Sequence, residues 1–136
     1  MKKFLISLIC TLSPFVFAAA SGAPNDGEYD VFVPIAKYIG RGDAEKLSAW
    51  FADNLEVSVF SSANDVSHNQ ARQIMKSFFD SYTPRSFEIT HTAGRGDMKY
   101  ALGTLNAGGQ TFGVTIFVSR KDNGYYIQQL KIEKTE

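Results

Sequence analysis

Residues 87–132 read FEITHTAGRGDMKYALGTLNAGGQTFGVTIFVSRKDNGYYIQQLKI, and this stretch decides the fold. It contains four runs in which apolar, β-branched or aromatic residues follow the pattern of a strand, at residues 87–92, 100–105, 111–119 and 125–132. Short glycine-containing connections separate these runs, at residues 93–97, 106–109 and 121–124. Because connections of this length join neighbouring antiparallel strands, the stretch predicts a four-stranded antiparallel meander.

Two helices are predicted at the start of the folded region. Apolar residues recur at helical spacing from Phe32 to Ile39, and Gly40 and Gly42 are expected to stop this helix. Asp43 suits the N-cap of a second helix, whose apolar face consists of Leu47, Trp50 and Phe51.

A strand and a third helix are predicted next. Apolar and polar residues alternate over residues 55–59, as in a half-buried strand. Ser67 and Gln70 have the spacing of a capping box, which is typical of the first turn of a helix. Pro84 ends this third helix, which carries a continuous apolar stripe made of Ala71, Ile74, Met75, Phe78, Phe79 and Tyr82.

The expected order of elements is therefore helix, helix, strand, helix and four strands. This order predicts an α+β fold, in which three N-terminal helices pack on one face of a strongly curved, mainly antiparallel sheet. A curled sheet covered in this way encloses a conical cavity. Residues 29–136 are predicted to form this one domain, because their number suits a single core.

The N-terminus has the pattern of a secretory signal peptide over residues 1–20. Lys2 and Lys3 precede an apolar run, and residues 18–20 supply a small-residue cleavage site. The run is shorter than the about 20 residues that a membrane-spanning helix needs. The pattern indicates an exported protein, periplasmic or secreted, with a flexible leader at residues 21–28 and no transmembrane segment after cleavage.

Charge and motifs exclude several classes of function. The chain has 136 residues with 14 basic and 14 acidic side chains, and removal of the signal peptide leaves 12 basic ones. Without a basic excess, nucleic-acid binding is not expected. The two histidines, His68 and His91, lie far apart with no acidic residue at ligand spacing, so no metal is expected. No nucleotide or other cofactor fingerprint is present, so no cofactor is expected.

The region around the second helix resembles the nuclear transport factor 2-like superfamily, whose fold is also called the cystatin-like cone or SnoaL-like fold. The resemblance rests on Gly42-Asp43, Leu47 and the step from Trp50 to Val57. Further stretches look like a bacterial family of small exported proteins of unknown function, at residues 67–71, 74–79, 84–87, 91, 100–105 and 126–132. The superfamily includes ketosteroid isomerases, dehydratases and polyketide cyclases as well as proteins that only bind ligands or assemble, so the fold alone decides no activity.

The resemblance implies two positions at which ketosteroid isomerases carry catalytic groups. The general base, an Asp near the end of the first strand, falls on Val59, which cannot abstract a proton. The oxyanion-stabilising Tyr falls on Ile35, and Tyr38 lies a helical turn away. Isomerase chemistry of this kind is therefore not expected. A non-catalytic role is favoured, while other enzymatic activity stays open.

The candidates for residues that line the cone and contact a ligand are Trp50, His91, Tyr100, Phe112 and Gln128. His91 is expected to point into the cone, because it continues the alternation of the apolar residues before it. A lone histidine, however, is more often half-buried and bonded to a neighbouring strand or to water. Aromatic residues likewise fill cores more often than they line ligand sites.

Three hypotheses about function follow. The first is a non-catalytic binding domain that holds a small amphipathic ligand in the cone pocket, and a cone filled by the protein's own side chains would contradict it. The second is a protein-interaction or dimerisation module that forms a homodimer through the sheet, as is common in the superfamily that the chain resembles. The third is a hydrolase or dehydratase that uses His91 with Tyr100 or a carboxylate, which requires that partner within hydrogen-bond reach.

Overall fold

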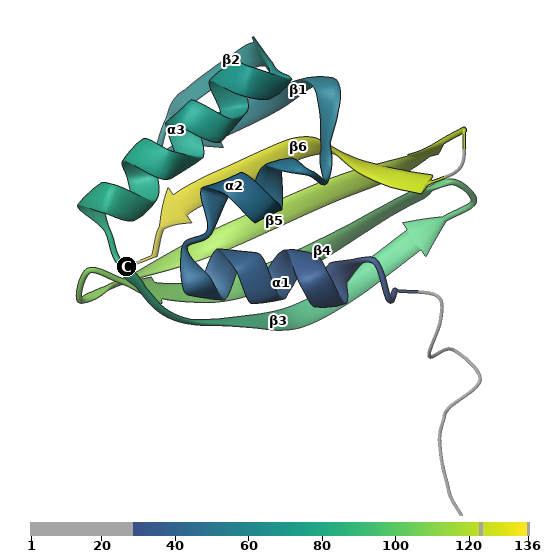
Figure 1. Ribbon diagram of the computed structural model, residues 1–136. Helices are drawn as coiled ribbons and strands as arrows, with labels where there is room; N and C mark the ends of the chain where they lie inside the picture. The colour runs from purple at the N-terminus through teal and green to yellow at the C-terminus, as the bar shows by residue number, and fades with distance from the viewer. Residues whose placement is uncertain (1–28, 123, 136) are drawn as a thin grey trace, which may run out of the picture. The chain divides into compact units, whose positions relative to one another are not determined.

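The computed structural model describes residues 29–122 and 124–135. The predicted signal peptide and leader lie outside the described residues. The chain divides into two units, residues 1–30 and 31–136, and the helices and strands described below belong to the second unit (Figure 1). In chain order these elements are α1 (Phe32–Arg41), α2 (Ala44–Ser48), β1 (Phe51–Val59), β2 (Ser62–Ser67), α3 (His68–Ser81), β3 (Pro84–Arg95), β4 (Met98–Ala107), β5 (Gln110–Lys121) and β6 (Gly124–Lys134).

The strands form one curved sheet with the order β2-β1-β6-β5-β4-β3 (Figure 1). Strands β3 to β6 pair with their neighbours in antiparallel orientation, which confirms the predicted meander. Strand β1 pairs with β6 in parallel orientation, and this pairing joins the N-terminal part of the unit to its last strand. The predicted α+β class, with helices on a mainly antiparallel sheet, is confirmed.

Strand β2 has no counterpart among the elements expected from the sequence. It follows β1 through a two-residue turn, Phe60-Ser61, and lies at the edge of the sheet. The side chains of residues 62–65 are exposed on both sides of the strand. A strand exposed on both sides has no reason to alternate apolar with polar residues, so its sequence lacks the usual strand pattern.

The helices lie on one face of the sheet, which we call the inner face (Figure 1). α1 packs against β3, α3 packs against β1 and β2, and α2 contacts both other helices. α1 ends at Arg41, so Gly40 lies within the helix and does not stop it. Gly42 forms the C-cap, and its φ of 68° is the left-handed conformation common after helices. The capping box of Ser67 and Gln70 opens α3 as predicted.

The second helix is shorter than the sequence predicted. Asp43 caps it as expected, by accepting a hydrogen bond from the Lys46 amide at 3.0 Å. Trp50 and Phe51, however, lie beyond its end, so their assignment to its apolar face is wrong. The carbonyl of Trp50 already accepts a hydrogen bond from the amide of Ile127, and this pairing with β6 draws the chain into β1.

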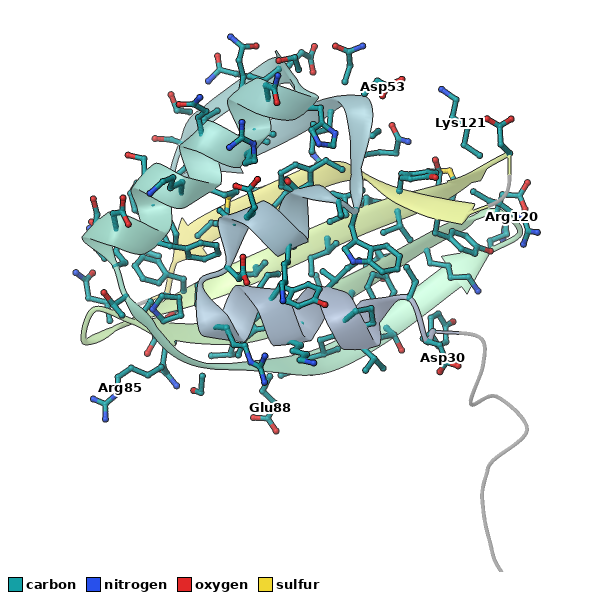
Figure 2. All side chains as sticks on the ribbon, viewed as in Figure 1. Asp30, Asp53, Arg85, Glu88, Arg120 and Lys121 are labelled. Carbon is teal, nitrogen blue, oxygen red and sulfur yellow. The ribbon has the colours of Figure 1, made fainter. Side chains whose placement is uncertain are left out.

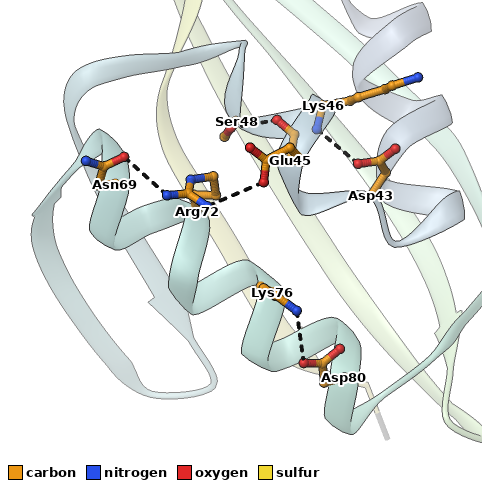
Figure 3. Close-up of polar contacts among 8 residues, drawn as sticks. All are labelled: Asp43, Glu45, Lys46, Ser48, Asn69, Arg72, Lys76 and Asp80. Carbon is orange, nitrogen blue, oxygen red and sulfur yellow. Dashed lines mark hydrogen bonds and ion pairs between the residues drawn. The ribbon is translucent and has the colours of Figure 1, made fainter.

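Polar contacts join α2 to α3 across the surface of the helical layer (Figure 3). Arg72 contacts Glu45 at 3.4 Å, and its guanidinium also lies 3.5 Å from the side-chain oxygen of Asn69. Lys76 and Asp80 form an exposed pair at 3.7 Å within α3. Exposed pairs of this kind contribute about 0–1 kcal/mol each, so the helices are held mainly by apolar packing.

The space between helices and sheet is filled by apolar side chains. The largest fully buried ones come from every layer, and they are Phe32, Ile35, Ile39, Leu47, Met75, Leu105, Phe112, Ile116, Ile127, Leu130 and Ile132. Within the described residues, no buried side-chain polar atom lacks a hydrogen-bond partner. None of the described helices is long and apolar enough to cross a membrane.

Candidate functional site

Phe112 was a candidate for the lining of the cone, and it lies in the packed core instead. Its exposed fraction is 0%. Its ring centroid lies 5.4 Å from that of Phe78, 5.1 Å from that of Tyr82 and 5.9 Å from that of Phe60. These rings meet in the edge-to-face and tilted arrangements that aromatic side chains prefer in cores. At this end of the sheet, aromatic side chains therefore occupy the space between β5, α3 and the β1–β2 turn.

Several hollows on the described surface lie at turns, at strand ends or along the edge strand β2. Their volumes run from about 180 Å³ to about 480 Å³. One hollow lies between the α1–α2 turn and α3, and another lies at the β4–β5 turn. A third is formed by the β5–β6 turn with the start of β1, and a fourth by the β1–β2 turn with the end of β6. The fifth lies along the edge strand β2. None of these hollows is lined by a residue that the sequence proposed for the cone.

His91 lies on the outer face of the sheet, which is the face turned away from the helices. The pairing of β3 with β4 shifts by one residue between Ile89 and His91, so that Ile89 is opposite Gly103 and His91 is opposite Leu102. Such a β-bulge moves every later side chain of the strand to the other face. His91 is accordingly exposed, and the expectation that it shares a face with Ile89 is wrong.

Tyr100 lies beside His91 on the outer face. The two ring centroids are 6.0 Å apart, and that of Phe117 lies 5.4 Å from that of Tyr100 on the next strand. Leu102 and Met98 alternate with Tyr100 along β4, and their exposed fractions are 37% and 52%. We call these residues the outer-face patch, defined as His91, Met98, Tyr100, Leu102 and Phe117.

The outer-face patch is surrounded by polar and charged side chains. Thr115 is opposite Leu102, and Gln129 is opposite Phe117. Glu56 of β1 is in turn opposite Gln129. At the other margin, Glu88 of β3 is exposed and points away from the helices (Figure 2). The outer face therefore has an apolar and aromatic centre with a polar margin.

Lys131 and Glu133 lie on the same face at the end of β6. Their side chains form an ion pair of 2.9 Å. The hydrogen bond to Glu133 and the charge of that carboxylate raise the pKa of Lys131, with a smaller contribution from Glu56. Both side chains are exposed, so the pair adds little to stability.

Trp50 and Gln128 occupy two further places, and both are half-buried. Trp50 lies immediately before β1, and its carbonyl accepts a hydrogen bond from the amide of Ile127 in β6. Gln128 is the extra residue of a second bulge, between Ile127 and Gln129, which pair with Val118 and Phe117. The structure thus brings His91 and Tyr100 together and leaves Trp50, Phe112 and Gln128 in separate surroundings.

The hydrolase hypothesis required an acid or hydroxyl within hydrogen-bond reach of His91. Among the residues that the structure describes, His91 has a ring contact with Tyr100 and no hydrogen bond or ion pair. In residues 29–122 and 124–135, no three His, Cys, Asp or Glu side chains come together as a metal site. Within the described residues, His91 therefore lacks the hydrogen-bonded acid or hydroxyl that this hypothesis requires.

One feature of the sequence could have revealed the outer-face patch. Strand β5 carries large apolar residues at successive positions, since Phe117 lies between buried Ile116 and Val118. Strand β4 carries the large side chains of Tyr100 and Leu102 on the face opposite to buried Ala101. A sheet with one solvated face normally alternates apolar with polar residues. Large apolar residues on both faces therefore indicate a second apolar surface.

Comparisons with known proteins agree with the fold. A family model described as "Domain of unknown function (DUF4783)" matches residues 32–133. A search of curated proteins gives no match. A DUF4783 family protein from Bacteroides ovatus is 24% identical, with a TM-score of 0.74 and coverage of 76% of this chain and 94% of that one.

More distant solved structures share the same architecture. An NTF-2-like protein of unknown function from Silicibacter pomeroyi is 13% identical, with a TM-score of 0.63 over 83% of this chain and 100% of that one. A putative calcium/calmodulin-dependent protein kinase type II association domain from Thiobacillus denitrificans is 9% identical, with a TM-score of 0.61 over 76% and 90%. The resemblance to the nuclear transport factor 2-like superfamily is confirmed as a likeness of fold.

Proposed function

The chain belongs to the family described as "Domain of unknown function (DUF4783)", and this description names no activity. We therefore propose a function from the exposed surface of the fold. We propose that the protein is a non-catalytic interaction domain that binds a second copy of itself through the outer face of the sheet. The observation that carries this proposal is the outer-face patch, in which exposed Met98 and Leu102 lie beside the rings of Tyr100 and Phe117.

The chemistry of the face supports a protein partner. Interface centres are depleted in charge and enriched in Tyr, Phe and Met, and their margins are polar. The outer-face patch has this composition, with Glu56, Glu88 and the Lys131–Glu133 pair around it. The margin carries both signs of charge, which is compatible with pairing between identical surfaces.

The size of the face supports a second copy as the partner. The outer face is five strands wide, at a spacing of about 4.8 Å, and about ten residues long, at about 3.3 Å per residue, so its area is about 800 Å². A stable interface of standard size covers about 800 Å² of each partner. A protein of similar fold adds support, because the neighbour from Thiobacillus denitrificans is described as an association domain.

A small amphipathic ligand inside the cone, the first of the hypotheses above, has less support. The side chains between helices and sheet are buried and in contact, so a ligand there would have to displace Phe112 or its neighbours.

Export remains part of the proposal, on the strength of the pattern at residues 1–20.

The proposal is tested by the oligomeric state in sedimentation equilibrium. We expect a dimer for the unaltered protein, and we expect Leu102→Lys to raise the dissociation constant at least about tenfold, because a lysine would be buried without a partner. Val33→Lys is the matched control, since Val33 is an exposed apolar residue of α1, 67% exposed, away from the sheet. A strict monomer at about 100 μM, or a dimer that Leu102→Lys leaves intact, would contradict the proposal.

A further inference from the structure

The turn between β1 and β2 holds Phe60 in an unusual backbone conformation. Its φ is 63°, in the left-handed region that glycine, asparagine and aspartate favour and that bulky residues avoid. Its amide donates a hydrogen bond of 2.7 Å to the carbonyl of Ile132, which fastens the turn to β6. A bulky residue in this region is strained, so the position of the Phe60 ring lowers the stability of the fold.

The ring of Phe60 covers the aromatic core described above. It contacts Phe78, Tyr82 and Phe112, with centroids 6.3, 6.0 and 5.9 Å away. The residue is half-buried, so one side of the ring packs on these rings while part of it stays accessible.

A hollow lies over the accessible part of this ring. Its volume is about 480 Å³, and it is lined by Phe60, Ser61, Glu133 and Lys134. The Nζ atom of Lys134 lies 5.3 Å from the centroid of the Phe60 ring, within the range of a cation–π contact. The hollow therefore combines an aromatic surface with an ammonium group.

Of the two charged side chains that line the hollow, the negative one is ion-paired within the described residues and the positive one is not. The carboxylate of Glu133 is paired with Lys131 at 2.9 Å. Lys134 forms no ion pair within the part of the chain that the structure describes, and its ammonium is exposed. An exposed ammonium beside an aromatic surface suits an anion that carries an apolar group, and it disfavours a cation.

We propose that this hollow binds a small amphipathic carboxylate. The apolar part of the ligand lies on the Phe60 ring, and its carboxylate accepts a hydrogen bond from the ammonium of Lys134. The Ser61 hydroxyl, exposed at the turn, is a second donor within the same hollow. The site shares only Glu133 with the margin of the proposed dimer surface, and neither of its donors, Lys134 and Ser61, belongs to that surface, so it does not depend on the dimer.

The test is a titration of the full protein followed by two-dimensional NMR of the backbone amides. The probes are 4-phenylbutyrate for an aromatic carboxylate, octanoate for an alkyl carboxylate and 4-phenylbutanol as the uncharged analogue. We expect one or both acids to shift the amides of Phe60, Ser61 and Lys134 with a dissociation constant of about 1 mM or below, which is ordinary for a contact of this size. Stronger binding of 4-phenylbutyrate than of octanoate would indicate an aromatic ligand, and the reverse a fatty acid.

Two substitutions decide the role of the ammonium. Lys134→Gln should weaken binding of the acids about fivefold or more and should leave binding of the alcohol unchanged. Lys121→Gln is the matched control, because Lys121 is an exposed lysine at the end of β5, beside the β5–β6 turn (Figure 2), whereas Lys134 is the last residue of β6. It should leave all three affinities unchanged.

Three outcomes would overturn the proposal. The first is the absence of amide shifts around Phe60 with both acids, each tested up to about 10 mM. The second is equal binding of the acids by the unaltered protein and the Lys134→Gln variant. The third is an equal loss of affinity in the Lys121→Gln variant, which would indicate attraction to the overall charge. Since Leu102→Lys should not change these titrations, failure of the dimer and failure of this site are distinguishable.

Discussion

At the scale of single residues, the close contact between Phe87 and Gly103 shows how a ring is accommodated on the inner face. A Cβ atom at Gly103 would lie 2.5 Å from Cζ of Phe87 and 2.8 Å from the carbonyl oxygen of Glu88. Neither the ring nor the backbone of the paired strand can move away without disturbing its neighbours. Position 103 therefore requires glycine, because any larger side chain would clash with the paired strand.

We expect Gly103→Ala to lower the free energy of unfolding by about 1–3 kcal/mol, the usual cost of overpacking. Denaturant unfolding followed by circular dichroism measures it. Gly113→Ala is the control, because a Cβ there would meet only Thr135 at an ordinary 3.6 Å, so its effect should stay within about 0.5 kcal/mol. A loss as large at Gly113 as at Gly103 would contradict the steric explanation.

Phe60 permits a second prediction at this scale, about backbone strain. Phe60→Gly and Phe60→Ala both remove the ring, but only glycine adopts a φ of 63° without cost. The glycine variant should therefore be more stable than the alanine variant by about 1 kcal/mol. Equal unfolding midpoints, or a more stable alanine variant, would show that the left-handed conformation costs little here.

At the scale of elements, the start of α3 is set by local side-chain chemistry. The amide of Gln70 donates to the Ser67 hydroxyl oxygen at 3.2 Å, and the Gln70 side chain accepts from the Ser67 amide at 3.1 Å. Two amides that a helix start leaves unpaired are satisfied in this way. α3 packs on β1 and β2, so its start influences how one end of the sheet is covered.

Ser67→Ala should lower the free energy of unfolding by about 1 kcal/mol, because it removes the hydroxyl acceptor of the capping box. Ser77→Ala is the matched control, since Ser77 is exposed in the middle of the same helix, where alanine is the better helix former. Chemical unfolding of both variants measures the difference. A similar loss in the control would mean that the effect does not come from the cap.

The element β3 shows how a local irregularity changes a surface. Without the bulge between Ile89 and His91, the imidazole would face α1 across the inner face, and the outer face would lose a ring beside Tyr100. With the bulge, His91 extends the aromatic row of β4 and β5. Bulges commonly re-aim side chains in this manner next to functional surfaces.

At the scale of the whole described unit, one apolar core holds the helices on the inner face of a continuous sheet. The chain contains a single cysteine, so no disulfide can form within it. The proposed dimer adds a second contribution to stability, since any partner that binds only the folded protein raises the unfolding midpoint in a concentration-dependent manner.

We therefore expect a single unfolding transition whose midpoint rises with protein concentration and does not respond to dithiothreitol. The Leu102→Lys variant should lose the concentration dependence, and Val33→Lys should keep it. Differential scanning calorimetry at several concentrations measures both effects. A midpoint independent of concentration in the unaltered protein would argue against a dimer in solution.

The sequence by itself determined the features that depend on neighbouring residues. Helical spacing and caps placed α1 and α3, and glycine-containing turns placed the meander of β3 to β6. The motif around Gly42-Asp43 and Trp50–Val57 predicted the superfamily fold that the comparisons confirm. These signals are local, because a cap or a tight turn is completed within a few residues.

Only the tertiary structure decided which surface is available for function. The parallel pairing of β1 with β6 ends α2 before Trp50, and the packing of α3 on the sheet buries Phe112. The register shift in β3 carries His91 from the inner face to the outer face. The physical reason is that strand register is set by pairing between distant segments, and a shift of one residue reverses the face of every side chain that follows.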